Sequence, residues 1–306
     1  MRALLVVNPK ATATTARTRA VLADALGSEA KLDVAETTHR GHAEVLARQA
    51  ALDGLELVVA LGGDGTVNEV VNGLLTDGPG PHVPALAVVP GGSTNVFARA
   101  VGQPADPVEA VGNLLEALRA QRRRTVGLGT ADGRWFTFCA GLGFDAAVVR
   151  RVDARRARGR RASGPLFVGE AVRHFFHGAE RGQPPLVLHR DGAPDEALYL
   201  ALVCNTAPWT YLGSRPVQPC PAASFDGGLD VFGLRRFGTV PMLRHLRQVL
   251  AVEPRPRGRA VVLAGDLAAF RLSAAGPVPF QLDGEDLGDR TEVTFASIPA
   301  ALAVVV

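Results

Sequence analysis

One short stretch of this chain, residues 62–66, constrains its fold more than any other. The stretch reads GGDGT, follows the apolar run Leu57–Leu61 and precedes a segment with helical spacing over 67–75. A strand that ends in glycines and opens into a helix is typical of phosphate sites. Glycine lets the backbone approach an anion, and the first N–H groups of the helix point at it. Asp64 would repel a phosphate on its own, so phosphoryl transfer with Mg²⁺ is the hypothesis that explains its place.

The first part of the chain alternates between strand-like and helix-like segments. Strands are predicted at residues 3–7, 31–35, 57–61 and 85–89, and helices at 16–26, at 42–52, and from 67 and 96 onward. Apolar runs of this kind are typical of buried parallel strands, so the sequence predicts a wound α/β sheet.

Beyond residue 134 the apolar runs are short and punctuated by Gly and Pro, a pattern that predicts mostly antiparallel sheet. The expected strands are 135–140, 186–189, 198–205, 229–234, 260–263, 268–273 and 278–282, interrupted by helices at 166–176 and 240–250.

Composition narrows the class of protein. With 306 residues, 47% of them hydrophobic, the chain can bury a large core, and its length favours two domains. No apolar run reaches the roughly 20 residues that cross a bilayer, and the start reads as a strand, so a secretory leader is not expected. Cys139, Cys204 and Cys220 lack metal spacing and fit reduced thiols without a catalytic role. We therefore expect a cytoplasmic protein.

The basic charge is local. The segment Arg150 to Arg161 holds seven arginines and one aspartate, a net charge of +6, although the whole chain carries only +3. Such a segment is either a solvated mobile loop or a surface that meets anionic lipid or nucleic acid. Nucleic acid is disfavoured because no aromatic residue lies between the arginines. Each basic residue near an anionic membrane contributes about 1 kcal/mol, enough together for peripheral, reversible docking.

A second glycine loop strengthens the first. The stretch PGGSTN, residues 90–95, also follows a predicted strand of the same sheet, and Asn8 and Lys10 follow the first strand. Ligands collect at the carboxyl ends of such strands, so we expect these loops to form one cleft. Taken singly, a glycine-rich turn after a strand is more often only a tight connection, so the pair carries the interpretation.

Six motifs, in their order along the chain, resemble those of a known protein family. The stretches NPKA, GGDGTVNEVVNGL, PGGSTNVFAR, AGLGFDA, FDGGLDV and LDGE span nearly the whole chain. Together they resemble the diacylglycerol kinase catalytic-domain family, which includes bacterial soluble lipid kinases and is related to sphingosine and ceramide kinases. The resemblance implies an N-terminal α/β ATP-binding domain over 1–125, similar to NAD kinases and phosphofructokinases. It also implies a C-terminal antiparallel β-sandwich for lipid and metal over 126–290, a cleft between the two, and a tail, 291–306, that returns to the first domain.

The resemblance further implies roles for individual residues. Glu285 matches the proton acceptor, and Asp226 matches a Mg²⁺ ligand, with carbonyl oxygens from Ala223 and Gly228. Asp64 competes with Glu285 as the base or holds Mg²⁺ through water. The positions that match ATP contacts are Asn8, Pro9, Lys10, Ala11, Thr12, Thr37, Gly62, Gly63, Asp64, Gly65, Thr66, Val67, Asn68, Gly92, Ser93, Thr94 and Asn95.

The chain departs from the family pattern at two places. Val96 occupies a position where many members carry an acid, and Lys10-Ala11 replaces a more usual Ser-Gly. Asp283-Gly284 before Glu285 is also a strong hairpin signal, which predicts an exposed turn; the turn and the catalytic role are compatible.

The expected activity is ATP-dependent phosphorylation of a lipid hydroxyl, with diacylglycerol converted to phosphatidic acid. Residues 166–168, Phe175, Phe176 and 209–211 could line an apolar entrance for this lipid, although core packing explains them equally well. His174 and His177 read as helix-end residues. An NAD kinase shares the Asp64 loop, and a nucleotide- or lipid-binding module without turnover would fit Val96. An exposed sheet edge could also pair two chains into a homodimer.

Overall fold

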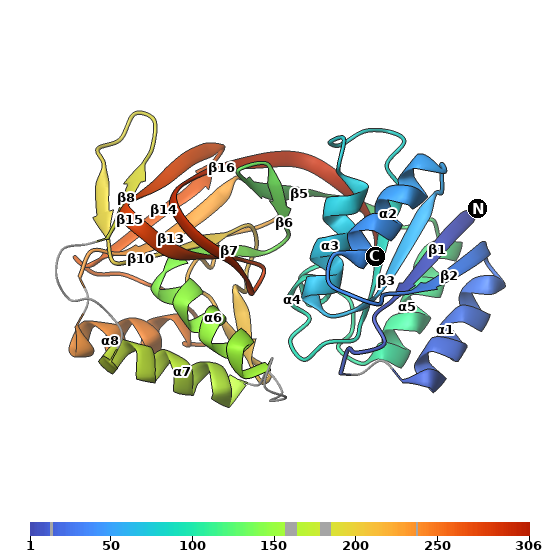
Figure 1. Ribbon diagram of the computed structural model, residues 1–306, viewed down its shortest axis with the longest axis horizontal. Helices are drawn as coiled ribbons and strands as arrows, with labels where there is room; N and C mark the ends of the chain where they lie inside the picture. Colours follow the sequence, from blue (N-terminus) through green and yellow to red (C-terminus); the bar gives the residue numbers. More distant parts are fainter. Residues whose placement is uncertain (13–14, 157–163, 178–184, 237) are drawn as a thin grey trace. The chain divides into compact units, whose positions relative to one another are not determined.

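The computed structural model describes residues 1–12, 15–156, 164–177, 185–236 and 238–306 (Figure 1). Residue contacts divide the chain into two units. The first comprises Met1–Leu128 and Pro299–Val306, and the second comprises Gly129–Ile298. Two strands, β5 (Arg123–Ala131) and β16 (Glu285–Val305), carry the chain from one unit into the other.

Parallel strands form the sheet of the first unit. They are β1 (Arg2–Val7), β2 (Lys31–Glu36), β3 (Leu57–Gly62) and β4 (Ala85–Pro90), joined by the end of β16. Their order is β16-β4-β3-β1-β2, and every pairing in it is parallel. The predicted parallel α/β sheet is confirmed for this part of the chain.

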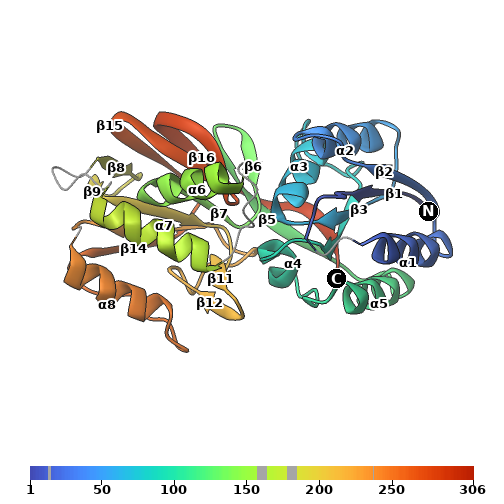
Figure 2. The ribbon, with the colours of Figure 1, turned by 60° about the horizontal axis from the view of Figure 1, so that its bottom comes forward.

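Helices cover both faces of this sheet (Figure 2). On one face α1 (Ala16–Gly27) and α5 (Pro107–Arg119) pack against alternate strand residues such as Leu5 and Val59. On the other lie α2 (His42–Leu52) and α3 (Asp64–Leu74), and the short α4 (Val96–Ala100) follows β4. Because successive strand residues face opposite sides, two helix layers explain why β3 and β4 are buried throughout.

Antiparallel strands build the second unit around an apolar core. β15 (Ala269–Leu282) pairs with β7 (Cys139–Gly143) through Phe280–Leu282 and with β8 (Leu186–His189) through Arg271–Ala274. Its pairing with β16 is irregular between Ser273 and Val278. Such an irregularity lets a strand bend from one layer of a sheet into another. The other strands are β6 (Arg134–Phe136), β7 (Cys139–Gly143), β8 (Leu186–His189), β9 (Glu196–Leu198), β10 (Leu200–Cys204), β11 (Thr210–Leu212), β12 (Arg215–Val217), β13 (Leu229–Leu234) and β14 (Val261–Leu267).

Three helices, α6 (Phe144–Arg156), α7 (Gly164–His177) and α8 (Thr239–Val249), lie together along the second unit in Figure 1. Phe144 of α6 and Met242 of α8 pack on a cluster that includes Leu200 and Leu202 of β10. Among the helices that the structure describes, none combines the length and apolar character needed to cross a bilayer.

Several sequence-based assignments need correction. Of the two alternatives for residues 150–161, the loop is wrong for 150–156, which belong to α6; residues 157–161 lie outside the described part of the chain. Ala146, Val149 and Val152 are buried at helical spacing, but the surrounding arginines masked that signal. The expected strands at 135–140 and 198–205 are each two strands, whereas 268–273 and 278–282 are one, β15.

Candidate functional site

The loops singled out in the first unit all follow the carboxyl ends of neighbouring strands. β1 lies between β2 and β3, so the chain winds outward in opposite directions from the β1–β3 boundary. Such a switch point is where open α/β sheets bind ligands, because the loops that leave the two strands diverge. Asn8 follows β1 and Gly63 follows β3, which places both at this boundary.

The two glycine loops touch each other. The Gly91 amide donates to the Gly62 carbonyl at 2.7 Å. A Cβ built on Gly92 would lie 2.7 Å from the Gly63 Cα, and one built on Gly63 would lie 3.2 Å from the Gly92 Cα. No side chain fits at the closer contact without moving backbone. The expectation that these two loops lie together is therefore met within the first unit.

Asp64 links the loop at residues 62–66 to α4, the helix that follows the loop at residues 90–95. It is the first residue of α3, and its Oδ1 accepts a hydrogen bond from the Phe97 amide of α4 at 3.2 Å. The N-cap residue of α3 is Gly63, which has no side chain to cap the helix. A helix start at a glycine, beside closely packed glycines, fits a phosphate group, because the first amides of a helix lack intrahelical acceptors.

Asn95 shapes the second loop. Its backbone is left-handed, with φ of 50°. The Gly92 amide donates to the Asn95 Oδ1 at 2.8 Å, and the Asn95 Nδ2 donates back to the Gly92 carbonyl at 2.9 Å. These two bonds close the loop on itself and leave Ser93 exposed at its tip, with Thr94 partly exposed.

Asn8 links the first strand to the glycine loop. Its Nδ2 donates to the Thr66 Oγ1 at 3.0 Å, while its Oδ1 accepts from the Lys10 amide at 3.0 Å. Pro9, Lys10 and Thr12 are exposed beyond it, and Ala11 is partly exposed. The structure thus joins Asn8, which follows β1, to Thr66 of α3, two residues that the sequence placed in one site.

Glu69 was not singled out from the sequence. Its carboxylate accepts from the Gly41 amide at 2.8 Å and from the Ala43 amide at 3.1 Å, so a residue of α3 caps α2. Because Gly41 supplies no capping side chain, an acidic residue from elsewhere had to satisfy these amides. Thr37 is held separately, through its amide bonded to the Val7 carbonyl at 2.8 Å.

Three residues near the loops are buried. Val67 and Asn68 are 2% and 3% exposed, so a nucleotide would meet their backbone and not their side chains. Val96 is 1% exposed. The position where many family members carry an acid therefore holds a core residue in this chain.

In the second unit, Glu285 begins β16 directly after a two-residue turn. Asp283 and Gly284 have φ of 48° and 78°, and Leu282 pairs with Glu285, as in the hairpin predicted from Asp-Gly. The predicted exposure of this turn is wrong for Asp283, which is 4% exposed. Its carboxylate accepts from the Thr137 amide and hydroxyl and from the Phe138 and Cys139 amides, at 2.7 to 3.1 Å. Four donors compensate the burial of its charge.

A second buried carboxylate stands behind the same turn. The Gln281 Nε2 donates to Asp145 Oδ2 at 2.8 Å, and the Gly284 amide donates to Gln281 Oε1 at 2.9 Å. Burial raises the pKa of Asp145 to about 6, although the bond from Gln281 acts to lower it. The AGLGFDA motif contains Asp145, but no role was assigned to it from the sequence.

The predicted metal ligands lie on one turn. The Gly227 amide donates to the Ser224 carbonyl at 3.2 Å, Asp226 is exposed, and the Ala223 carbonyl accepts from the Ala207 amide at 3.1 Å. One carboxylate and two carbonyls are oxygen donors of the kind that Mg²⁺ takes, and a carbonyl with one hydrogen bond keeps a second lone pair. The donor set fits, although no cluster of three His, Cys, Asp or Glu side chains forms within the described residues.

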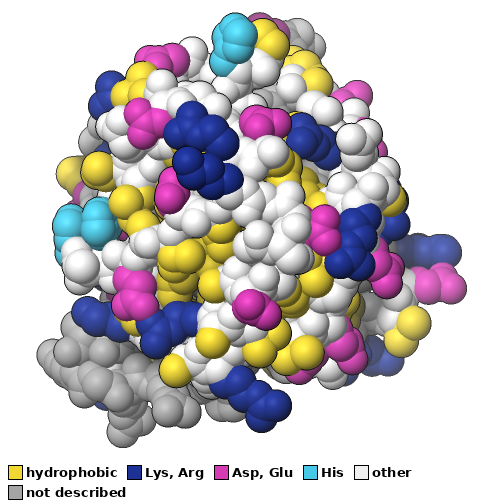
Figure 3. All heavy atoms as spheres, turned by 90° about the vertical axis from the view of Figure 1, so that its right-hand side faces the viewer, with side chains coloured by type: hydrophobic (Ala, Val, Ile, Leu, Met, Phe, Trp, Pro, Cys, Tyr) yellow, Lys and Arg dark blue, Asp and Glu magenta, His cyan; other side chains and the backbone are white. Residues whose placement is uncertain are grey.

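The structure describes part of the arginine segment and part of the proposed apolar entrance. Arg150 and Arg155 form ion pairs within the protein, with Asp286 and Glu170, so neither is a simple solvated charge. Figure 3 shows the face on the right-hand side of Figure 1, where the first unit is drawn, and acidic and basic side chains are interspersed there. The described candidates at the entrance, Leu166 and Phe167 and residues 209–211, are partly buried, and Trp209 packs on a core cluster. The side chains of Val168, Phe175, Phe176 and His177 lie outside the described ones.

His174 is a packing residue. Its ring stacks on Phe144 with centroids 5.1 Å apart. Burial, together with the positive charge of Arg151, lowers the pKa of His174, which favours the neutral ring.

Comparison with known proteins places these features in a family. Residues 2–131 match the diacylglycerol kinase catalytic domain. A probable lipid kinase, YegS-like, from Chromohalobacter salexigens is 31% identical over 83% of this chain and 77% of that protein. The diacylglycerol kinase of Bacillus subtilis is 41% identical over 35% of this chain and 33% of that protein.

A solved structure shares the fold. The crystal structure of a diacylglycerol kinase from Bacillus anthracis superposes with a TM-score of 0.73 at 20% identity, covering 99% of this chain and 96% of that one. Since the Chromohalobacter relative is matched over 77% of its length at 31% identity, the chain belongs to the diacylglycerol kinase catalytic-domain family.

Proposed function

We propose that this protein is an ATP-dependent lipid kinase that transfers the γ-phosphoryl group to a lipid hydroxyl, with diacylglycerol as the leading acceptor. The observation that carries the proposal is the contact between Gly63 and Gly92 at the start of α3, whose N-cap residue is Gly63. Backbone amides so arranged suit a triphosphate, and family membership points to lipid acceptors.

The proposed reaction transfers one phosphoryl group and one proton. The acceptor hydroxyl oxygen bonds to the γ-phosphorus, the bond from that phosphorus to the oxygen of ADP breaks, and the hydroxyl proton passes to the Glu285 carboxylate. Positioning and charge neutralisation supply most of the rate enhancement in such reactions, and a general base adds about 10² to 10⁴. Glu285 is preferred to Asp64 as the base because it matches the position of the proton acceptor in the family, whereas Asp64 lies in the proposed phosphate loop and would hold Mg²⁺ through water.

Mg²⁺ is proposed at two places. With ATP it would neutralise charge on the transferring phosphoryl group. In the second unit, Asp226 with the carbonyls of Ala223 and Gly228 would hold a structural ion. Gly228 is fixed there, since its amide donates to Asp266 Oδ1 at 2.7 Å.

The proposal is tested by incubating the protein with labelled ATP, Mg²⁺ and either diacylglycerol in mixed micelles, a total lipid extract, or NAD. Labelled lipid supports a lipid kinase. Labelled NADP would replace the proposal with an NAD kinase, and bound ATP without any product would replace it with a binding module.

Glu285→Gln should lower kcat by at least about 10²-fold while the KM for ATP changes less than about twofold, because the amide cannot take a proton. Glu292→Gln, on the same strand and paired with Arg271, is the matched control and should keep near-normal turnover. A normal kcat for Glu285→Gln would reject the base assignment.

We propose peripheral membrane docking through fewer arginines than the seven in the segment. Arg150 and Arg155 are paired within the protein, so the proposed docking depends on Arg151 and on the arginines from 156 onward, whose side chains lie outside the described ones. Sedimentation with liposomes tests this: binding must require anionic lipid and weaken with salt.

A further inference from the structure

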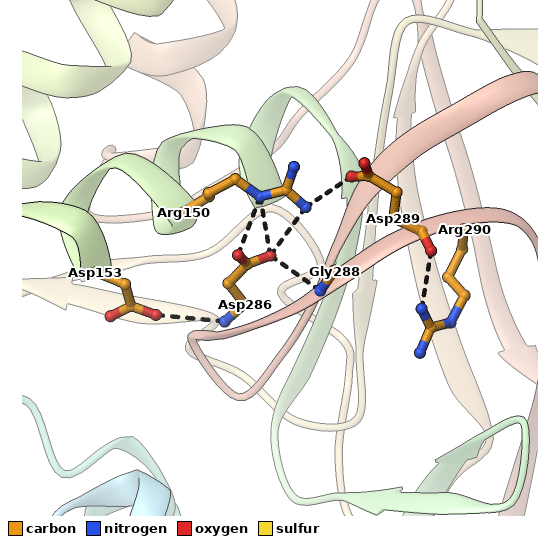
Figure 4. Close-up of polar contacts among 6 residues, drawn as sticks. All are labelled: Arg150, Asp153, Asp286, Gly288, Asp289 and Arg290. Carbon is orange, nitrogen blue, oxygen red and sulfur yellow. Dashed lines mark hydrogen bonds and ion pairs between the residues drawn. The ribbon is translucent and has the colours of Figure 1, made fainter.

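The strand that begins with Glu285 is held by α6. The turn before it is set by Asp283, but the residues after it, 286–289, meet side chains of the helix (Figure 4). Arg150 and Asp153 are one turn apart on α6, and both reach residue 286.

Arg150 forms ion pairs with two carboxylates of this segment, those of Asp286 and Asp289. Its Nε lies 3.0 Å from Asp286 Oδ2 and one terminal nitrogen lies 3.1 Å from Asp286 Oδ1, a forked pairing of guanidinium and carboxylate. The same terminal nitrogen lies 2.7 Å from Asp289 Oδ1. The two aspartates in turn raise the pKa of Arg150.

The amides near Glu285 are held by side chains. Gly284 donates to Gln281 Oε1 at 2.9 Å, Asp286 donates to Asp153 Oδ2 at 3.4 Å, and Gly288 donates to Asp286 Oδ1 at 3.2 Å. Gln281 is itself bonded to Asp145, again a residue of α6. The backbone on both sides of Glu285 is therefore fixed through one helix.

Charge explains why an arginine is needed here. Residues 283–289 read DGEDLGD and carry four acidic side chains. Like charges this close repel one another, and an arginine that bridges two of them offsets the repulsion. Asp286 is only 25% exposed in its side chain, so leaving it without its partner would cost more than a surface carboxylate would.

We propose that Arg150 is a positioning residue for Glu285, acting through Asp286, so that the proton acceptor is presented in one orientation. The inference rests on the proposed function of Glu285. No contact between Arg150 and substrate is implied.

The test compares two arginines with similar ion pairs. Arg235 forms a forked pair with Glu196 in the same unit, at 2.8 and 2.7 Å, and its side chain is 40% exposed against 36% for Arg150. Arg235→Ala is thus the matched control for Arg150→Ala. Arg150→Lys, Asp286→Asn and the double variant Arg150→Ala/Asp286→Asn complete the set, with Glu285→Gln measured in parallel.

Arg150→Ala should lower kcat by about 10- to 100-fold, since small misplacements of a reacting group have effects of this size, while the KM for ATP stays within about twofold. Arg150→Lys should fall between, because one ammonium cannot fork onto Asp286 and also bridge to Asp289. The double variant should be no slower than the slower single variant, because both changes break one linkage. Arg235→Ala should keep the wild-type kcat.

A second readout does not depend on turnover. Hydrogen exchange of a peptide that spans residues 281–292 should quicken by about tenfold or more in Arg150→Ala and stay unchanged in Arg235→Ala, because Asp286, the acceptor of the Gly288 amide, loses the guanidinium that holds it. The inference is overturned if exchange is unchanged, or if it quickens while kcat matches that of Arg235→Ala. If the wild-type protein phosphorylates no acceptor, or Glu285→Gln is fully active, the proposed function or its base fails instead, and the positioning inference falls with it.

Discussion

Two buried aspartates in the second unit show how environment sets the behaviour of a residue. Asp283 receives four hydrogen bonds from residues 137–139, so its charge is compensated where it is buried. Asp145 is also buried but is bonded to the neutral amide of Gln281, and its pKa rises to about 6. The same side chain thus receives four donors at one position and a single neutral donor at the other, where burial raises its pKa.

Asp145 should make stability depend on pH in a defined window. Its pKa is raised from 3.8 to about 6 on burial, so its favourable contribution is complete below pH 4 and is lost as pH rises through 6. Two pKa units correspond to about 3 kcal/mol. Asp145→Asn cannot titrate, so the free energy of unfolding of the wild type, relative to this variant, should fall by about that amount between pH 4 and 7. Urea unfolding of both proteins at several pH values checks this; a difference independent of pH would contradict it.

At the scale of elements, the first unit brings two loops into contact that are separated by a helix and a strand. The Gly62 carbonyl and Gly91 amide bond across β3 and β4, and the next residues, Gly63 and Gly92, meet backbone to backbone. Asp64 then links the start of α3 to α4. Three separate contacts therefore fix the loops that we propose as the phosphate site, and the glycines are needed for closeness and not for unusual backbone angles.

Gly92→Ala should separate these loops. The new Cβ would lie 2.7 Å from the Gly63 Cα, so backbone must move, at a cost of about 1–3 kcal/mol in unfolding free energy and with weakened ATP binding. Gly112→Ala in α5 is the control, because a Cβ there meets nothing within 4 Å and alanine favours a helix; it should stabilise by about 0.4–1 kcal/mol. Urea unfolding and titration with a fluorescent ATP analogue measure both effects. Equal behaviour of the two variants would contradict the contact.

At the scale of the whole molecule, the end of the chain completes the core of the first unit. Val304 pairs with Leu86 at the side of β4 and is fully buried, and Leu302 and Val305 are 2% and 1% exposed. β16 therefore serves both units: it begins at the proposed base, Glu285, and ends inside the α/β sheet.

Removal of residues 299–306 should unfold the first unit. Burial of a Val or Leu side chain stabilises by about 1.5–3 kcal/mol, so three of them account for a large share of the roughly 5–15 kcal/mol that holds a typical domain. Removal of Val306 alone, which is only partly buried, is the control. The far-ultraviolet circular dichroism signal of the first unit's helices and ATP binding should both be lost in the longer truncation and kept in the shorter one. A folded, ATP-binding truncated protein would show that the tail is dispensable.

Self-association through a sheet edge stays a prediction. β2 is the edge strand of the first unit, and Lys31, Asp33 and Glu36 lie along it. Charges on an edge strand disfavour pairing with another chain, so measurement of mass in solution bears directly on the expected homodimer.

Sequence alone located much of the proposed phosphate site, for a physical reason. Gly62–Thr66 and the loop at 90–95 each combine a buried strand, a turn and a helix start, and all three are local consequences of residue type. The family motifs likewise drew attention to Glu285. What local pattern could not reveal was the partner of each residue: Glu69 for Gly41, Gln281 for Asp145, and Phe97 for Asp64.

The sequence by itself therefore determined the parallel α/β start of the chain, its glycine loops and the Asp-Gly hairpin, because hydrophobic period and glycine content act over a few neighbouring residues. Only the tertiary structure decided that Asp283 is buried, that Val96 lies in the core, and that an arginine-rich stretch read as a loop begins as α6 and holds the strand of Glu285. For Asp283 and Arg150 those outcomes depend on contacts with residues more than a hundred positions away, where burial and charge pairing outweigh local preference.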